Sequence, residues 1–291
     1  MAQEVKILHD KDADASILQG KTVAVIGYGS QGSAQALCMR DSGVNVIIGS
    51  RKGPSFDRAV ADGFQVMSAS EAAAKADIIH ILLPDEFHKS TYDKEIKQHM
   101  TPGKTLSCSH GFNVVFKQIL PPEGCDVIMV APKSPATEER KAFLAGFGVP
   151  GLVAVKQDAT GHAGKTALAM AKAMGFTRAG VLECTFEQET YEDLFGEQNV
   201  LCGGCVDLMK YGFETLVEAG YPPEMAYFEC IHELKLIVDL VFEGGIQKMN
   251  KVISNTAEFG EYFNGPQILP PDVKARMKES QIGRASCRER V

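Results

Sequence analysis

The sequence lacks three features that would mark a membrane, secreted or nucleic-acid-binding protein. It contains no run approaching the roughly 18 apolar residues that a membrane-spanning helix needs, and residues 1–7 have no apolar signal core. No block of basic residues is present, and the formal net charge is -7, which argues against a nucleic-acid surface. With 45% hydrophobic and 23% charged residues, the composition predicts a soluble globular protein of the cytoplasm.

Eight cysteines are scattered through apolar contexts in a chain large enough to form a core without disulfides. We therefore expect reduced cysteines packed in the interior. Cys202 and Cys205 form a C-x-x-C pattern, which is also typical of redox sites, but they follow an acidic segment rather than a strand. Packing is the favoured interpretation of this pair.

The length and the order of apolar patterns predict two domains. A chain of 291 residues exceeds one comfortable core. Up to about residue 160, short β-branched runs alternate with helical patterns, which is typical of a doubly wound parallel sheet of the Rossmann type. Later residues show long helical patterns only. We predict an α/β protein with a Rossmann-type domain over residues 1–182 and an all-helical domain over residues 183–281.

A glycine-rich motif lies between a strand-like run at residues 21–26 and a helical pattern at residues 33–39. In this context a G-x-G-x-x-G motif indicates a dinucleotide site. The glycines permit a tight turn and let the backbone approach the pyrophosphate, which lies at the helix N-terminus. An ordinary strand-to-helix turn is the alternative. The predicted cofactor-binding residues of the motif are Gly27, Tyr28, Gly29, Ser30, Gln31 and Gly32.

The loop after the next strand-like run, residues 44–48, indicates which dinucleotide binds. An NAD-specific site would place Asp or Glu there to bind the ribose hydroxyls, but this chain has Arg51, Lys52 and Ser55. Two cations and a hydroxyl suit a 2′-phosphate, so we predict NADP(H). An exposed basic loop that binds no ligand is the alternative.

Three later strand-like runs end in residues that suit a ligand site, because ligands bind at the carboxyl ends of parallel strands. Asp85 follows the first run, His110 the second and Lys133 the third. His110 could carry a proton, and Lys133 could contact an anion. Each could instead be a loop residue that makes a local hydrogen bond.

Two pairs of carboxylates lie four residues apart in apolar segments, Asp193 with Glu197 and Glu229 with Glu233. On a helix each pair shares one face, and that face continues into apolar residues. We therefore expect the four acids to point towards protein, where an unpaired carboxylate is costly. All-oxygen ligands suit magnesium, so a two-metal centre is the hypothesis. A solvated acidic face is the alternative for either pair.

Taken together, the motifs resemble those of the ketol-acid reductoisomerases, also called acetohydroxyacid isomeroreductases. The resemblance covers about residues 5–279, and the helical part is similar in length to the short bacterial and archaeal form. The motifs that carry it are residues 27–32 (GYGSQG), 83–86 (LPDE), 109–112 (SHGF), 131–133 (APK), 193–198 (DLFGEQ), 226–237 (AYFECIHELKLI) and 253–258 (ISNTAE).

The resemblance implies a role for each matching residue. Asp193, Glu197, Glu229 and Glu233 would hold two Mg²⁺ ions. His110, Lys133 and Glu233 would be catalytic, and Ser254 would contact the substrate carboxylate. Pro84, Asp85 and Gly111 would border the cofactor.

The resemblance also implies a reaction and an assembly. The enzyme would convert 2-acetolactate to 2,3-dihydroxy-3-methylbutanoate, and 2-aceto-2-hydroxybutanoate to the homologous acid, by alkyl migration and ketone reduction with NADPH. The pathway would be valine and isoleucine synthesis. Short-form members assemble as dimers in which the partner supplies the second acid pair, so a homodimer or a larger homo-oligomer is expected. Their helical domain is knotted, a rare exception to the rule that chains do not thread themselves.

Three segments depart from the family pattern. Ser33 replaces the usual histidine after the glycine motif, which should have a modest effect because backbone amides grip the phosphates. Residues 136–140 read ATEER where the family reads Gly-His-x-Val-Arg, so the catalytic rate is expected to change. Residues 282–291 match nothing in the family and resemble a translated sequencing adapter. We therefore expect a truncated helical domain with a foreign tail, in a chain that still binds NADPH but turns over acetolactate poorly and dimerises weakly or aggregates.

Two other functions fit the residues before the resemblance is considered. One is an NADP-dependent hydroxyacid dehydrogenase with a helical second domain. The other is a non-catalytic protein that binds a dinucleotide or a metal.

Overall fold

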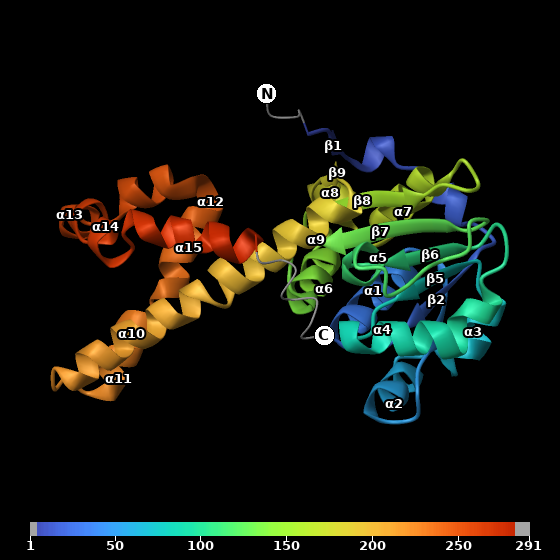
Figure 1. Cartoon of the computed structure of the whole chain (residues 1–291), viewed down its shortest axis with the longest axis horizontal. Coiled ribbons are helices and arrows are strands. Elements are labelled where there is room, and N and C mark those ends of the chain that lie inside the picture. The colour runs from blue at the N-terminus through green and yellow to red at the C-terminus, as the bar shows by residue number, and fades with distance from the viewer. Residues whose placement is uncertain (1–4, 283–291) are drawn as a thin grey trace. The chain divides into compact units, whose positions relative to one another are not determined.

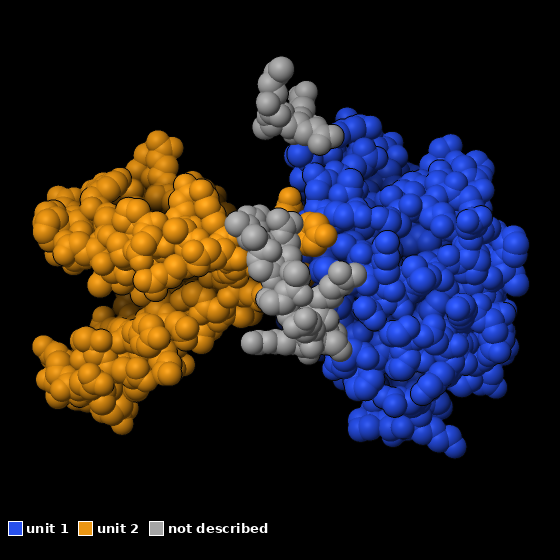
Figure 2. Space-filling view, in the orientation of Figure 1, with its two compact units in different colours: residues 1–190 blue, residues 191–291 orange. Residues whose placement is uncertain are grey.

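The structure, a computed structural model, describes residues 5–282 of the chain. It divides into two compact units, residues 1–190 and residues 191–291, which we call the N-terminal unit and the helical unit (Figure 2). The division falls inside helix α9 (Phe186–Phe195). A strand-containing part followed by a helical part is the predicted fold class, whereas the expected domain boundary at residue 182 stays a prediction. No helix among the described residues is long and apolar enough to cross a membrane.

One nine-stranded sheet forms the centre of the described N-terminal unit, in the order β1-β9-β8-β7-β6-β5-β2-β3-β4. The six strands from β4 to β7 run parallel, which confirms the Rossmann-type arrangement. The strands are β1 (Ile7–Leu8), β2 (Thr22–Ile26), β3 (Asn45–Gly49), β4 (Gln65–Met67), β5 (Ile78–Ile81), β6 (Thr105–Cys108), β7 (Asp126–Pro132), β8 (Gly151–Gln157) and β9 (Val181–Glu183).

The sheet is mixed rather than wholly parallel, which corrects the expectation from the sequence. β8 pairs antiparallel with β7, and β1 pairs antiparallel with β9. Gly151 at the start of β8 lies opposite Pro132 at the end of β7, so the chain between them returns at the same end of the sheet. A buried apolar strand has the same composition in either direction, and for this reason the sequence pattern does not reveal the reversal.

Both faces of the sheet are buried, because alternate residues of each strand pack against helices on opposite sides (Figure 1). In β2, Val23 and Val25 belong to one hydrophobic core, whereas Ala24 and Ile26 belong to the other. Parallel strands with both faces covered place their carboxyl ends along a single edge. That edge carries the loops predicted to bind the cofactor.

The helices of the N-terminal unit connect these strands. They are α1 (Ser30–Asp41), α2 (Pro54–Ala61), α3 (Ala69–Lys75), α4 (Asp85–Thr91), α5 (Phe112–Val115), α6 (Ala136–Leu144), α7 (Ala163–Ala173) and α8 (Phe176–Ala179), with the 3₁₀ or π segments η1 (Asp10–Asp12), η2 (Ala15–Leu18), η3 (Tyr92–Ile96) and η4 (Lys97–His99).

The helical unit is all-helical over its described residues, as predicted. It contains α10 (Gly204–Glu218), α11 (Pro223–Tyr227), α12 (Leu234–Val252), α13 (Asn255–Phe263), α14 (Gly265–Ile268) and α15 (Pro271–Ile282), with the π segments η5 (Gly196–Leu201) and η6 (Phe228–His232). Helix α12 is kinked at Gly244 and Gly245, which have non-helical backbone angles. Residues 283–291 of the adapter-like tail lie outside the described residues.

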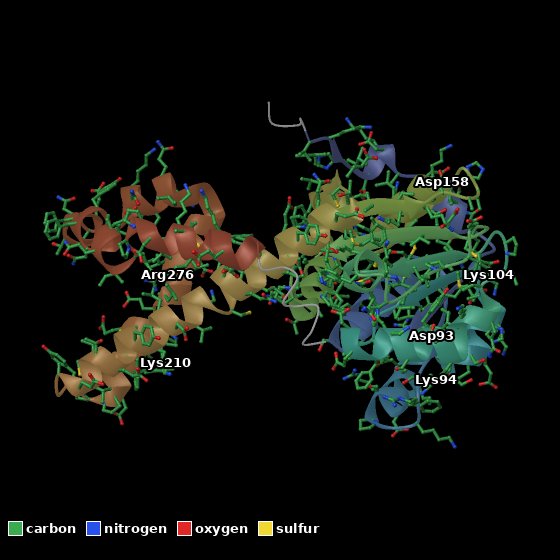
Figure 3. All side chains as sticks on the ribbon, viewed as in Figure 1. Asp93, Lys94, Lys104, Asp158, Lys210 and Arg276 are labelled. Atoms are coloured by element: carbon green, nitrogen blue, oxygen red, sulfur yellow. The ribbon has the colours of Figure 1, made fainter. Side chains whose placement is uncertain are left out.

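The helical unit has almost no core of its own. Between residues 191 and 280, only Ala226 and Met249 are buried. Large apolar side chains are instead exposed, including Leu201 at 65% and Phe242 at 89%. Lys210 and Arg276, which are labelled in Figure 3, each form an ion pair with an acid four residues away on the same helix. These pairs on the surface contribute little stability.

The cysteines of the described chain are all free, as expected. Cys38, Cys108 and Cys125 are buried, but Cys202 is exposed, so the prediction of an interior position is wrong for Cys202 in the single chain. Its neighbourhood belongs to the exposed apolar surface of the helical unit. Cys287 lies outside the described residues.

Candidate functional site

The glycine motif forms the turn from β2 into α1, and its three glycines meet three different demands. Gly27 has φ 101°, and a Cβ there would lie 2.9 Å from the Leu82 carbonyl oxygen. A Cβ on Gly32 would lie 2.2 Å from the Gly27 carbonyl oxygen, so only glycine lets helix and turn pack closely. A Cβ on Gly29 would meet nothing within 4 Å. The open side at Gly29 leaves room for a phosphate at the N-terminus of α1.

Two side chains near this turn, those of Tyr28 and Arg58, make contacts that the sequence motif does not reveal. The Tyr28 ring is buried, and its hydroxyl donates to Asp62 Oδ2 at 2.7 Å. Burial, followed by this hydrogen bond, raises the pKa of the Tyr28 hydroxyl above its ordinary value. Tyr28 therefore offers a ligand its backbone only. Arg58 on α2, which the sequence analysis missed, donates to the Tyr28 carbonyl and lies 3.4 Å from the Gly29 carbonyl oxygen.

The predicted phosphate-binding residues lie in and after the loop between β3 and α2. Arg51 and Lys52 are exposed, and Ser55 is half-buried in the first turn of α2. The Arg51 guanidinium lies 5.7 Å from the centre of the Phe87 ring on α4. This loop therefore presents positive charge beside the turn after β3, where the ribose of a dinucleotide lies in Rossmann-type folds.

The loop after β5 also reaches the carboxyl edge of the sheet. Pro84 caps α4, and Asp85 is its first residue. The Asn113 amide on α5 donates to Asp85 Oδ1 at 3.0 Å and lies 3.3 Å from the Asp85 carbonyl oxygen. The contact joins the loop after β5 to the segment that follows β6.

A buried carboxylate joins the two predicted catalytic residues of the N-terminal unit. Glu189 on α9 is 1% exposed, and its Oε1 lies 3.1 Å from His110 Nδ1 and 3.7 Å from Lys133 Nζ. Its Oε2 accepts a hydrogen bond of 3.0 Å from the Gly111 backbone N–H. A buried charge needs such partners. The structure therefore brings His110 and Lys133 together around an acid that the sequence analysis did not single out.

Close packing keeps α9 against this loop. A Cβ on Gly111 would lie 2.3 Å from Thr190 Oγ1, so the loop after β6 and α9 touch at backbone distance. Glu189 also precedes the predicted metal ligand Asp193 by four residues on the same helix. That spacing was the available sequence signal, but glutamates next to other acids are usually solvated.

The two acid pairs of the helical unit do not meet the expectation of burial. Glu197, Glu229 and Glu233 are exposed and Asp193 is half-buried, because the apolar residues that continue the same faces are themselves exposed. Their role as metal ligands stays a prediction. One member of each pair lies in a π-helical segment, Glu197 in η5 and Glu229 in η6, and this rare geometry is frequent at functional sites.

Ser254, predicted to contact the substrate, is the N-cap of α13, where its hydroxyl accepts a hydrogen bond of 3.2 Å from the Ala257 N–H. Capping explains a serine at this position without any ligand. The hydroxyl is exposed and can still donate its own proton. The substrate contact therefore stays a prediction.

Comparisons with known proteins match both parts of the chain to one family. Residues 17–180 match the acetohydroxy acid isomeroreductase, NADPH-binding domain, and residues 186–282 match the ketol-acid reductoisomerase, C-terminal domain. A ketol-acid reductoisomerase (NADP(+)) of Akkermansia muciniphila is 74% identical over 274 residues, which cover 94% of this chain and 84% of the relative.

A second relative differs in the cofactor that it is named for. A ketol-acid reductoisomerase (NAD(+)) of the uncultured archaeon GZfos26G2 is 63% identical over 282 residues, which cover 95% of this chain and 85% of the relative. The solved structure of an NADH-preferring ketol-acid reductoisomerase from an uncultured archaeon, also 63% identical, superposes with a TM-score of 0.93 over 95% of this chain and 85% of that one. With a Rossmann-type sheet, a glycine turn open to a phosphate and both domain matches, the chain belongs to the ketol-acid reductoisomerase family.

Proposed function

We propose that this protein is an Mg²⁺-dependent, NADPH-dependent reductoisomerase of valine and isoleucine synthesis. It converts 2-acetolactate to 2,3-dihydroxy-3-methylbutanoate, and 2-aceto-2-hydroxybutanoate to the homologous acid. The observation that carries the proposal is the buried Glu189 carboxylate, which lies against His110 and Lys133. This cluster lies on the same edge of the sheet as the open glycine turn at Gly29.

The donor set fits a hard divalent cation. Asp193, Glu197, Glu229 and Glu233 offer carboxylate oxygens only, and magnesium is usually held by a few carboxylates with water and substrate oxygens. When bound, two Mg²⁺ ions would lower the pKa of the substrate hydroxyl and polarise its ketone. The π segments η5 and η6, each of which contains one of these acids, support this assignment because π-helical turns are frequent at functional sites.

The residues of the N-terminal unit orient the reacting groups. Glu189 Oε1 lies 3.1 Å from His110 Nδ1 and so orients the imidazole ring, which can carry a proton in the reaction. Lys133, 3.7 Å from the same carboxylate oxygen, balances its charge and can contact a substrate anion.

Two residues of the helical unit complete the proposed chemistry. In this proposal Glu233 also takes part in proton transfer, and Ser254 donates its hydroxyl proton to the substrate carboxylate.

The preference for NADPH rests on charge in the loop after β3. Arg51, Lys52 and Ser55 supply two cations and a hydroxyl for a 2′-phosphate, and no acid stands among residues 50–55 to bind ribose hydroxyls. Relatives at 74% and 63% identity are named for different cofactors. The proposed preference of this chain therefore rests on the charges of its own loop.

A second copy of the chain is the proposed partner. The helical unit exposes apolar side chains beside both acid pairs, such as Leu201 and Phe228. Covering them would remove apolar surface from water, which stabilises an interface by about 25 cal/mol per Å². A homodimer in which each copy completes the acid site of the other explains why these carboxylates stand on apolar helices.

Replacement of one proposed ligand tests the metal site. Glu229→Gln keeps size but removes the charge, so we expect Mg²⁺-dependent turnover of acetolactate to fall by roughly 100-fold or more with little loss of fold. Glu224→Gln, on an exposed position of the neighbouring α11, is the matched control and should leave turnover unchanged. Near-wild-type turnover by Glu229→Gln at low Mg²⁺ would remove Glu229 from the site.

A further inference from the structure

A chain of hydrogen bonds runs through the interior of the N-terminal unit beneath the candidate site. His80 on β5 and Gln35 on α1 are both 0% exposed. His80 Nε2 lies 2.7 Å from Gln35 Oε1, and His80 Nδ1 lies 2.9 Å from Ser107 Oγ on β6. Gln35 Nε2 lies 3.1 Å from Ser109 Oγ and 3.2 Å from Gln31 Oε1.

A backbone carbonyl fixes the orientation of the two amides in this chain. The Ser134 carbonyl can only accept, so Gln31 Nε2 donates to it and Gln31 Oε1 accepts from Gln35 Nε2. Gln35 Oε1 is therefore the acceptor for His80, and the Ser109 hydroxyl, 2.9 Å from the Val130 carbonyl oxygen and 3.2 Å from Gln35 Oε1, can donate to either. His80 therefore carries its proton on Nε2, and its Nδ1 accepts from the Ser107 hydroxyl. Burial lowers the pKa of His80 to about 4, so the ring is neutral at pH 7.

The network ends at the three loops that hold the candidate site. Gln31 belongs to the glycine turn, and its amide nitrogen lies 3.4 Å from the Ser134 carbonyl oxygen. Ser134 follows Lys133, and Ser109 precedes His110. Gln35 thus contacts the cofactor loop and the His110 loop directly, and it reaches the Lys133 loop through Gln31.

We propose that Gln35, oriented by His80, is a positioning residue that keeps the cofactor turn, His110 and Lys133 in register for hydride transfer to the bound substrate. This proposal rests on the proposed function. A buried polar network restrains geometry strongly when every member is satisfied, because any other arrangement leaves a donor or acceptor unpaired in the interior. Neither residue touches the reacting atoms, so both act through the loops.

Paired variants separate positioning from simple packing. Gln35→Met keeps the side-chain volume and removes all hydrogen-bonding sites of the amide. His80→Met likewise keeps the approximate volume and removes both ring nitrogens. His80→Gln retains one donor and one acceptor. Thr177→Val is the control, because it removes a buried hydroxyl on α8 that bonds to Asp10 rather than to the site.

We expect Gln35→Met to lower kcat for acetolactate by roughly tenfold or more and to raise the NADPH dissociation constant several-fold, because displacements of about 1 Å can cost 100-fold in rate. The substrate KM should change little. His80→Met should lower kcat similarly, and His80→Gln should recover most of the loss. Thr177→Val should lower the Tm while kcat and the NADPH dissociation constant stay at wild-type values.

The tautomer gives a test that is independent of activity. In the full chain with ¹⁵N-labelled histidine, the signal that disappears in His80→Gln should show a proton on Nε2 and none on Nδ1. A proton on Nδ1 would overturn the proposal, as would a folded Gln35→Met with kcat and NADPH affinity within twofold of wild type. If the wild-type chain does not turn over acetolactate, the proposed function fails, but the tautomer and the NADPH affinities still decide the positioning role.

Discussion

Glu189 carries the strongest prediction at the scale of single residues. Its buried carboxylate accepts from the Gly111 N–H and lies within 3.1 Å of His110 Nδ1. Glu189→Gln keeps the shape but replaces one acceptor oxygen with an amide donor and removes the charge beside Lys133. We expect kcat to fall by roughly 100-fold, a typical loss when a group that orients an acid–base residue is removed.

The control for this variant lies on the same helix. Glu187 forms a surface ion pair with Lys156, so Glu187→Gln should change kcat by less than twofold. Steady-state kinetics with circular dichroism would compare the two variants. Equal, small effects from both would mean that Glu189 is a structural acid only.

Glu139 carries a stability prediction. Its carboxyl is 1% exposed and both oxygens lack a partner, whereas its neighbour Arg140 bonds to Asp41 instead. Burial raises the pKa of Glu139 to about 8 from its ordinary value of 4.5. Between these values the folded chain keeps a proton that the unfolded chain releases. Within this pH range, the contribution of Glu139 to the free energy of unfolding therefore falls by about 1.4 kcal/mol for each unit by which the pH rises.

A replacement at position 139 should remove that dependence. Glu139→Val restores the residue that the family pattern has at this position, and we expect it to raise the free energy of unfolding by roughly 3 kcal/mol at pH 7 and little at pH 5. Urea unfolding at both pH values is the measurement. An equal gain at pH 5 and pH 7 would show that Glu139 is not protonated in the folded chain.

At the scale of elements, the loop between β3 and α2 sets the cofactor preference. Charge-assisted hydrogen bonds contribute about 1.5–3 kcal/mol each, and less where they are exposed. Replacing both Arg51 and Ser55 with Asp should therefore lower the ratio of kcat/KM for NADPH over NADH by at least about tenfold. Lys94→Asp, an equally exposed charge change on η3, should leave it unchanged. An unaltered ratio in the double variant would contradict the claim that this loop sets the preference for NADPH.

Elements whose structure depends on residues close together in the sequence were predictable, and elements that depend on contacts between residues far apart in the sequence were not. The turn at Gly27 needs glycine for local steric reasons, so its motif identified it. The reversal of β8 depends on where the chain re-enters the sheet, which no apolar run records. Glu189 was missed because its burial comes from β6 and β7 loops that are remote in sequence.

At the scale of the whole molecule, the two units differ in how much of their apolar surface they bury. The N-terminal unit buries both faces of its sheet. The helical unit leaves Phe242 at 89% exposure and Glu229 and Glu233 exposed. The sequence pattern predicted that these acids point towards protein, and in the structure Glu229 and Glu233 are exposed instead. Their exposure depends on the three-dimensional packing of the helices, which the local pattern does not record.

Consumption of NADPH with 2-acetolactate, followed with and without Mg²⁺, tests the central claim most directly. The purified chain should oxidise one NADPH for each 2,3-dihydroxy-3-methylbutanoate formed, and excess chelator should abolish both. Restoring Mg²⁺ should restore both. No oxidation of NADPH or NADH with either ketol acid, or turnover that persists in excess chelator, would contradict the account.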